Sequence, residues 1–302
     1  MRRLRNSIVR RVKRPLLRLY SEAVLSAPVR PDRADIPQCS GRYGPPSGEP
    51  LRLALLGDSL ALSVGAGHPS RAVGGVMAAE LAATADRPVD LAVLARFGTT
   101  ATHLSQQVER LGRVDGAPGT AVVIVGGNDV LVPTRMTTSA GQLAQQLVRL
   151  RDMGWSVVLA SCPQIRHQPS LRPWTRRFAG HRSRRLAMLQ TREALRAGAR
   201  VVSLYDSQLL VENEDTLLCT DSFHPSAQGY AVHLERLLPA LLAASDIRPS
   251  SGAREVLLDE AIRAAVMVPG LHCAPGSRRG LAVVDLDRHP LPAGTNLNDC
   301  AS

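Results

Sequence analysis

Short, nearly continuous apolar runs alternate along the chain with longer segments in which apolar residues recur every three or four positions. Such runs predict buried strands, and such recurrence predicts amphipathic helices. The helical period is clearest at Ala140–Met153, where Leu143, Leu147 and Leu150 share one face. The other helices are expected at Ala72–Ala83, Thr102–Leu111, Arg182–Ala197 and Ala227–Ala244. Strands are expected at Leu51–Leu56, Val89–Ala95, Ala121–Val125, Val157–Ala160 and Ala199–Leu204.

Strands that alternate with helices are typical of a parallel sheet covered by helices on both faces. We therefore expect an α/β fold with three α/β/α layers built on a five-stranded parallel sheet. In open sheets of this kind, ligands bind beside the carboxyl ends of the strands. Three polar segments directly follow predicted strands, namely Gly57–Ser59, Gly98 and Gly126–Asp129. These segments should therefore meet at one edge of the sheet.

Composition divides the chain into three regions. Residues 1–50 form a basic N-terminal arm and a linker rich in Pro, Gly, Ser and Arg, and residues 51–246 form the α/β domain. Residues 247–302 form a C-terminal extension of unknown role, which either packs on the core or binds a partner. Within it, Arg254–Val268 predicts an amphipathic helix, Pro269–Gly280 has little order, and Leu281–Leu286 predicts an edge strand.

The formal net charge of +11 is concentrated in residues 2–18 and in Arg166–Arg185. In the first cluster, apolar residues lie between the basic ones, which suits an amphipathic helix in peripheral contact with an anionic membrane. A solvated arm is the favoured alternative, since Pro15 interrupts the helical pattern. The aromatic fraction of 3% argues against base-stacking platforms, so no specific nucleic-acid partner is expected.

The arm lacks the uninterrupted apolar stretch of a secretory signal, and no other stretch is long and apolar enough to cross a bilayer. We therefore expect a cytoplasmic protein, either soluble or peripheral at the inner face of the membrane. The cysteines are scattered without a CxxC pair, which indicates reduced thiols rather than a disulfide framework or a zinc site. They are Cys39, Cys162, Cys219, Cys273 and Cys300.

Ser59 and His224 are the strongest candidates for chemistry. Serine is a weak nucleophile at neutral pH, so it needs a base that takes its proton and a third group that orients the base. His224 and Asp221 suit these roles, because their spacing lets the carboxylate fold back on the imidazole. Pro225 favours the start of a helix, which would present His224 at a junction of loop and helix.

A carbonyl attacked by Ser59 develops negative charge on its oxygen, and donors aimed at that oxygen lower the barrier. We assign this oxyanion hole to the backbone N–H of Ser59, the N–H of Gly98 and the side-chain amide of Asn128. Glycine at position 98 lets the backbone approach a substrate without a Cβ in the way. The amide of Asn128 donates without adding a charge that would perturb His224.

Four segments resemble, in order and spacing, the sequence blocks of the GDSL or SGNH hydrolases, most closely the bacterial esterase-like members. They are Gly57–Leu60, Gly98, Gly126–Asp129 and Asp221–Ser226, and the likeness covers about Leu51–Ala244. The resemblance implies a flavodoxin-like fold, with Ser59 as nucleophile and with His224 and Asp221 as base and orienting group. It places Gly98 and Asn128 in the oxyanion hole, and it implies no metal or organic cofactor.

Other polar residues near these blocks have less specific interpretations. His68 lies in the loop after the serine and is a candidate to line the acyl pocket. Asp58 is a candidate for substrate contact, although for Asp58 and Asp129 we favour a role in holding loops by hydrogen bonds. His233 is expected to pack against the sheet.

Arg166 and Trp174 belong to a basic insertion at Pro163–His181. Such a segment suits an anionic acyl donor or a phospholipid head group, because arginine binds phosphate with two hydrogen bonds. A solvated basic helix is the favoured alternative.

The leading hypothesis is a serine esterase or lipase-like hydrolase that cleaves carboxylic esters or thioesters through an acyl-serine intermediate. Its substrate would be a small-molecule ester or a lipid. An O-acyltransferase or deacetylase acting on a sugar or lipid hydroxyl would use the same site. A third hypothesis is a non-catalytic protein that binds membrane or nucleic acid, although helix-turn-helix, Walker and dinucleotide-binding motifs are missing from the sequence.

Overall fold

A computed structural model describes residues 36–114, 116–206, 213, 215–248 and 252–285 of the chain. In these ranges nine strands form one sheet, in the order β1-β3-β2-β4-β5-β6-β8-β9-β7. The parallel core of the sheet is formed by β2 (Leu51–Gly57), β3 (Val89–Val93), β4 (Thr120–Ile124), β5 (Ser156–Ala160) and β6 (Arg200–Val202). The predicted parallel strands are therefore confirmed, and their order is that of a flavodoxin-like sheet.

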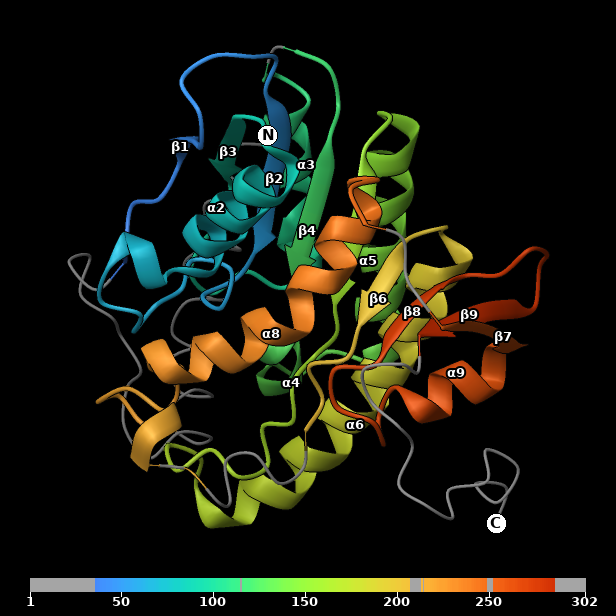
Figure 1. Cartoon of the computed structure of the whole chain (residues 1–302). Helices are drawn as coiled ribbons and strands as arrows, with labels where there is room; N and C mark the ends of the chain where they lie inside the picture. The colour runs from blue at the N-terminus through green and yellow to red at the C-terminus, as the bar shows by residue number, and fades with distance from the viewer. Residues whose placement is uncertain (1–35, 115, 207–212, 214, 249–251, 286–302) are drawn as a thin grey trace, which may run out of the picture.

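Helices cover both faces of the sheet, as predicted. One face packs against α2 (Val73–Ala85) and α8 (Ala227–Ala244), which lie on the viewer's side of Figure 1. The other face packs against α3 (Leu104–Leu111), α5 (Met136–Asp152) and the second half of α6 (Pro173–Arg196). The described ranges also contain α4 (Gly127–Leu131), α9 (Leu258–Ala264) and the 3₁₀ helices η2 (Pro69–Arg71) and η3 (Ala101–His103).

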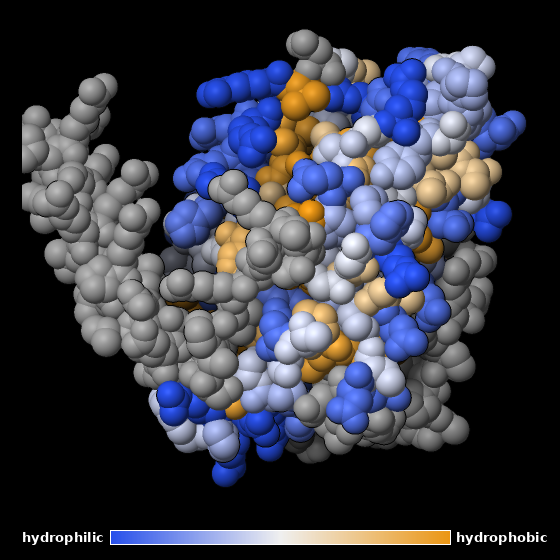
Figure 2. All heavy atoms as spheres, turned by 90° about the vertical axis from the view of Figure 1, so that its left-hand side faces the viewer, coloured by the Kyte–Doolittle hydropathy of each residue, from blue (hydrophilic) through white to orange (hydrophobic). Residues whose placement is uncertain are grey.

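The alternation of side chains along each strand supplies two separate cores. In β2, Leu53 and Leu55 face α2 and α8, whereas Ala54 and Leu56 face α3 and α5. Because successive side chains of a strand point to opposite faces, a strand buried on both sides must be apolar throughout. Figure 2 shows one side of the molecule, where hydrophilic residues surround smaller hydrophobic patches.

The expected number of five strands is too small, because antiparallel strands extend the sheet at both ends. At one end β1 (Gly41–Tyr43), in the expected linker, pairs with β3, and Arg42 forms an ion pair with Asp90 at 2.8 Å. Three residues, of which the first two are exposed, are too short a pattern to separate from a linker.

At the other end, the C-terminal extension adds β7 (Ala253–Leu257), β8 (His272–Pro275) and β9 (Leu281–Asp285). The single helix expected at Arg254–Val268 is wrong, because its first part is β7 and only the part from Leu258 to Ala264 is helical. The segment expected to have little order contains β8. The last strand pairs with both β8 and β7, so β7, not β9, lies at the edge.

The long helix α6 begins at Pro173, nine residues before the expected start at Arg182. Proline suits the first helical position, but the arginine-rich first half has no apolar period that would reveal a helix. None of the helices in the described ranges is long and apolar enough to span a bilayer. Most of the basic arm (residues 1–35) lies outside the described residues, so its membrane contact and the cytoplasmic location stay predictions.

Candidate active site

Ser59 lies at the carboxyl end of β2, and Gly57 determines how the chain reaches it. Gly57 has φ +137°, and a Cβ at this position would lie 1.8 Å from the carbonyl oxygen of Ile124 on β4. The close approach lets the N–H of Asp58 donate to the same oxygen at 3.0 Å. The chain then turns sharply, with the N–H of Val64 bonded to the carbonyl of Ser59 at 3.1 Å. Only glycine fits this junction without strain.

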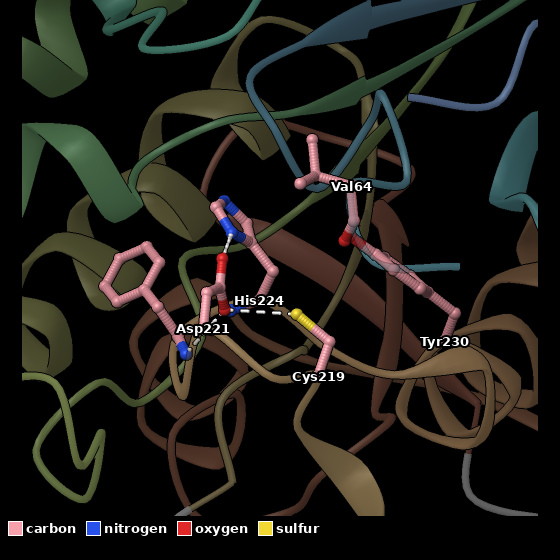
Figure 3. Close-up of polar contacts among 6 residues, drawn as sticks. Val64, Cys219, Asp221, His224 and Tyr230 are labelled. Atoms are coloured by element: carbon pink, nitrogen blue, oxygen red, sulfur yellow. Dashed lines mark hydrogen bonds and ion pairs between the residues drawn. The ribbon is translucent and has the colours of Figure 1, made fainter. Parts of the chain in front are cut away.

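His224 and Asp221 lie in the loop before α8. Nδ1 of His224 and Oδ2 of Asp221 are 2.5 Å apart, and Oδ1 of Asp221 accepts the backbone N–H groups of Phe223 and His224 at 2.9 and 2.8 Å. Figure 3 shows the carboxylate and the imidazole pointing toward one another. Nε2 of His224 is buried without a hydrogen-bond partner. The carboxylate therefore fixes one ring nitrogen and leaves the other for a further contact.

The surroundings of the pair hold Asp221 ionised. Burial raises the pKa of Asp221, but hydrogen bonds from the side chain and backbone of His224 and from the thiol of Cys219 outweigh it and place the pKa well below its ordinary value. Sγ of Cys219 donates to Oδ1 of Asp221 at 3.1 Å. Burial raises the pKa of Cys219 to about 11, which keeps this thiol protonated as a donor.

A hydrogen bond connects α8 to the loop that follows Ser59. The hydroxyl of Tyr230, on the first turn of α8, donates to the carbonyl of Val64 at 2.9 Å (Figure 3). Ser226 caps the same helix by accepting the N–H of Gly229 at 3.2 Å. These bonds fix the loop that follows Ser59 relative to the helix that follows His224.

Asn128 lies in the first turn of α4, directly after β4. Its Nδ2 donates to the carbonyl of Thr99 at 3.0 Å and lies 3.5 Å from Oδ2 of Asp58. Gly98 precedes Thr99, is exposed, and has φ +71°. On its other side, the ring of Phe97 lies 5.8 Å from that of His224. The serine, glycine, asparagine and histidine segments thus meet at one end of the sheet.

Two buried carboxylates, those of Asp58 and Asp129, hold the loops around these segments by hydrogen bonds. Both oxygens of Asp129 accept the N–H of Ala101, at 3.2 and 3.1 Å, and Oδ1 also accepts the hydroxyl of Ser139. Oδ1 of Asp58 accepts the N–H of Leu60 at 3.0 Å. Burial, reinforced by the charge of Asp129, raises the pKa of Asp58 to about 7. Burial also raises the pKa of Asp129.

Ser59, Asn128 and His224 line one cleft that is open to solvent. The lining is largely apolar and includes Leu60, Ile165, Leu204, Leu217, Leu218 and Phe223. His233, which was expected to pack against the sheet, lines the cleft as well, and burial lowers its pKa to about 4.

Three candidate substrate residues lie outside the lining of this cleft. His68 is exposed, and its Nδ1 accepts the N–H of Ser70 at 3.2 Å, so it caps η2. Arg166 and Trp174 are exposed, Arg166 in the loop before α6 and Trp174 in the first turn of that helix. Asp58, in contrast, is among the residues that line the cleft.

Sequence reasoning missed two buried glutamines that hold the strand ends at the site. Gln107 of α3 accepts the N–H of Gly57 at 2.7 Å and donates to its carbonyl at 2.8 Å. Gln190 of α6 accepts the N–H of Cys162 at 2.7 Å and donates to the carbonyl of Val125 at 2.9 Å. A glutamine on the apolar face of a helix is the signal that could have identified them, since a buried amide needs partners.

Arg182 of α6 is a third supporting residue that was missed. Its guanidinium donates to the carbonyls at the C-terminal end of α4, which bears Asn128. The acceptors are Asp129, Val130, Val132 and Thr134, at 2.7–2.9 Å. In the part of the chain that the structure describes, no cluster of three His, Cys, Asp or Glu residues could hold a metal ion.

This arrangement has the parts needed for acyl transfer. A buried serine and a carboxylate-oriented imidazole border one cleft, and an amide donor lies beside them. Such a combination can activate a hydroxyl and stabilise a negative oxygen.

Comparison with known proteins identifies relatives. Residues 55–232 match the model of the GDSL-like Lipase/Acylhydrolase family. The chain is 30% identical over 195 residues to the GDSL-like esterase Rv1075c of Mycobacterium tuberculosis (strain ATCC 25618 / H37Rv). That match spans 63% of this chain and 62% of the relative, so it leaves more than a third of the relative unmatched.

Solved structures share the fold. The crystal structure of TesA is similar with a TM-score of 0.51 and 18% identity, covering 64% of this chain and 99% of that one. The lipase Lip_vut3 from a goat rumen metagenome is similar with a TM-score of 0.51 and 18% identity, covering 66% and 100%. At such identities the likeness concerns the fold alone. Because the family model matches more than half of the sequence, the chain belongs to the GDSL-like lipase/acylhydrolase family.

Proposed function

We propose that the protein is a serine esterase that cleaves carboxylic esters or thioesters through an acyl-serine intermediate. The observation that carries this proposal is the buried, unpartnered Nε2 of His224 in the cleft that Ser59 also lines, with Nδ1 held by Asp221. A base with one nitrogen fixed and the other free is what activation of a serine requires. The esterase name of the 30% identical relative supports the same assignment.

In the first half of the reaction, Oγ of Ser59 attacks the carbonyl carbon and its proton passes to Nε2 of His224. The ionised Asp221 stabilises the resulting imidazolium. The tetrahedral intermediate then collapses, the bond to the leaving oxygen or sulfur breaks, and His224 returns the proton to that atom. In the second half, water adds to the acyl carbon and gives a proton to Nε2 of His224. The bond between the acyl carbon and Oγ of Ser59 then breaks, His224 returns the proton to Oγ, and the acid is released.

The negative oxygen of the intermediate receives hydrogen bonds from the backbone N–H groups of Ser59 and Gly98 and from Asn128. A side-chain amide has two N–H donors. One N–H of Asn128 is bonded to the carbonyl of Thr99 at 3.0 Å, which orients the group. The second makes only a long contact with Oδ2 of Asp58, at 3.5 Å, which the substrate oxygen would replace. Removing one such donor typically lowers kcat about a hundredfold to a thousandfold. Asn128→Ala is expected to fall in that range.

The apolar lining of the cleft fits the acyl part of an ester. Leu60, Ile165 and Leu217 present aliphatic side chains beside Ser59, and burial of each methylene contributes about 0.8 kcal/mol. We therefore expect kcat/KM to rise with acyl chain length across a series of nitrophenyl esters, until the cleft is filled.

A fluorophosphonate probe tests the proposal, because it reacts with an activated serine and stays attached. We expect the wild-type protein to be labelled on the peptide containing Ser59, and Ser59→Ala to remain unlabelled. His224→Ala should label far more slowly, and hydrolysis of nitrophenyl acetate should fall at least about a thousandfold in both variants. Ser70→Ala is the matched control, since Ser70 is exposed and is not among the residues that line the cleft. Labelling that persists in Ser59→Ala would refute the assignment.

A further inference from the structure

The first half of α6 presents two exposed aromatic rings. Trp174 is 70% exposed, the highest value among the large apolar side chains of the described residues, and Phe178 is 57% exposed. Residues four positions apart lie on the same side of a helix, so the two rings form one ridge. Transfer of both rings out of water would be favourable, since each aromatic side chain can remove about 150–250 Å² of surface from water.

Exposed basic residues follow the same side of the helix. Arg177, His181, Arg184 and Arg185 are all exposed and lie three, seven, ten and eleven positions after Trp174. No Asp or Glu occurs between Pro163 and Arg192, so no acidic side chain of this segment offsets their charge. We call the surface formed by Trp174, Arg177, Phe178, His181, Arg184 and Arg185 the α6 stripe.

The α6 stripe is connected to the cleft. The loop before α6 supplies Gln164, Ile165 and Gln168 to the cleft lining. Arg176 ties this loop to the helix by donating to the carbonyls of Pro169 and Leu171, at 3.3 and 3.2 Å. On the other side, the guanidinium of Arg182 lies 5.2 Å from the ring of Phe178 and also holds the end of α4. The helix that bears the stripe is therefore held to a loop that lines the cleft and to α4, which bears Asn128.

We propose that the α6 stripe docks on a lipid bilayer that contains anionic head groups. Aromatic rings beside arginines are the side chains that favour the membrane interface, where the rings leave water and the guanidinium groups meet phosphates. A basic residue near an anionic surface contributes about 1 kcal/mol. Docking would bring the cleft against the membrane, where esters of long acyl chains are held.

A bilayer explains both parts of the stripe better than a nucleic acid does. Single-stranded nucleic acid is bound in a basic groove whose aromatic rings lie flat for stacking. Here the rings project into solvent from one helix, and the loop that leads into this helix lines the apolar cleft. The proposal depends on the surface of α6 and goes beyond the esterase assignment, so it can fail while that assignment holds.

Vesicle binding by the full chain tests the proposal. The vesicles contain either phosphatidylcholine alone or equal parts of phosphatidylcholine and phosphatidylglycerol, and binding is measured by co-sedimentation. We expect binding to the anionic vesicles and a blue shift of tryptophan fluorescence. The shift would report on Trp174, because the second tryptophan, Trp155, is buried.

Variants of the stripe should weaken vesicle binding and leave the cleft intact. We expect the double variant Trp174→Ser and Phe178→Ser to lower the affinity at least about tenfold. Arg177→Gln and Arg184→Gln should each lower it about fivefold. The matched control is Val148→Ser with Arg149→Gln, an exposed apolar residue and an exposed arginine on α5. Hydrolysis of soluble nitrophenyl acetate should stay unchanged in all of these variants.

The basic arm is the competing membrane element, and the full chain allows a direct comparison. A variant with Arg2, Arg3 and Arg5 replaced by Gln tests the arm. If this variant loses vesicle binding while the Trp174 and Phe178 variant retains it, the proposal for α6 is overturned. Equal binding to both kinds of vesicle, or binding of RNA without binding of vesicles, would overturn it as well. Ser59→Ala tests the esterase assignment separately. Loss of nitrophenyl acetate hydrolysis in that variant would support the esterase assignment whether or not the protein binds vesicles.

Discussion

The thiol of Cys219 and the imidazole of His224 bind opposite oxygens of one carboxylate, that of Asp221. Sγ of Cys219 lies 3.1 Å from Oδ1, and Nδ1 of His224 lies 2.5 Å from Oδ2. A carboxylate that accepts an additional hydrogen bond is less basic. The thiol therefore tunes how strongly Asp221 attracts the protonated imidazole during the proposed reaction.

Cys219→Ala removes this donor and should change the pH dependence of kcat/KM. Oδ1 keeps the two backbone N–H groups but loses the thiol, so Asp221 becomes more basic and holds the imidazolium more tightly. We expect the acidic limb of the profile to move to higher pH, by less than about one pH unit. Cys219→Ser supplies a hydroxyl donor and should restore the wild-type profile. A uniform loss of activity in both variants, with no movement of the limb, would indicate a purely structural role.

Asp58→Asn should stabilise the protein at alkaline pH. Burial raises the pKa of Asp58 from 3.8 to about 7, so the folded state binds this proton more tightly than the unfolded state. Ionisation of Asp58 therefore lowers the free energy of unfolding as the pH rises from about 4 to 7. Above pH 7 the total loss is about 4 kcal/mol. Urea unfolding at pH 8 and pH 4 measures the effect. The gain in the free energy of unfolding over the wild type should be large at pH 8 and small at pH 4. An equal gain at both pH values would contradict this effect of the Asp58 charge.

Gly57→Ala should disrupt the start of the site. Its Cβ would lie 1.8 Å from the carbonyl oxygen of Ile124, in a backbone conformation that alanine rarely adopts. We expect destabilisation of about 4 kcal/mol or more, measured by urea unfolding. Gly141→Ala is the control, because nothing lies within 4 Å of its Cβ and it is inside α5. That substitution should stabilise the protein by about 0.5–1 kcal/mol, and similar results for both glycines would refute the steric argument.

Arg182→Lys should affect the proposed transition state more than substrate binding. A single ammonium group cannot reach the four carbonyls that the guanidinium holds, so α4 and Asn128 lose their fixed position. We expect kcat to fall about tenfold while KM changes little, since oxyanion stabilisation acts after binding. Arg185→Lys, at an exposed position of the same helix, should behave like the wild type. A change confined to KM would contradict this role for Arg182.

The parallel core was predictable because β2, β4 and β5 are buried over most of their length and are therefore nearly continuous apolar runs. The polar segments that follow these strands, such as Gly57–Ser59 and Asn128, could be assigned to one edge because the carboxyl ends of parallel strands meet there. The strands β1, β7 and β8 were missed because short antiparallel strands with one exposed face leave little pattern. Contacts such as that of Gln107 with Gly57, fifty positions apart, depend on packing that no local pattern records.

The pairing of β8 with β6 has a consequence for truncated forms of the protein. Val201 and Val202 of β6 are buried and are paired with Cys273 and His272. A fragment that ended after α8 would leave the backbone N–H and C=O groups of β6 unsatisfied along an open edge. Because open edges of this kind recruit strands from other molecules, we expect such a fragment to self-associate more readily than the full chain. The last described strands thus cover an edge that would otherwise be open to a second molecule.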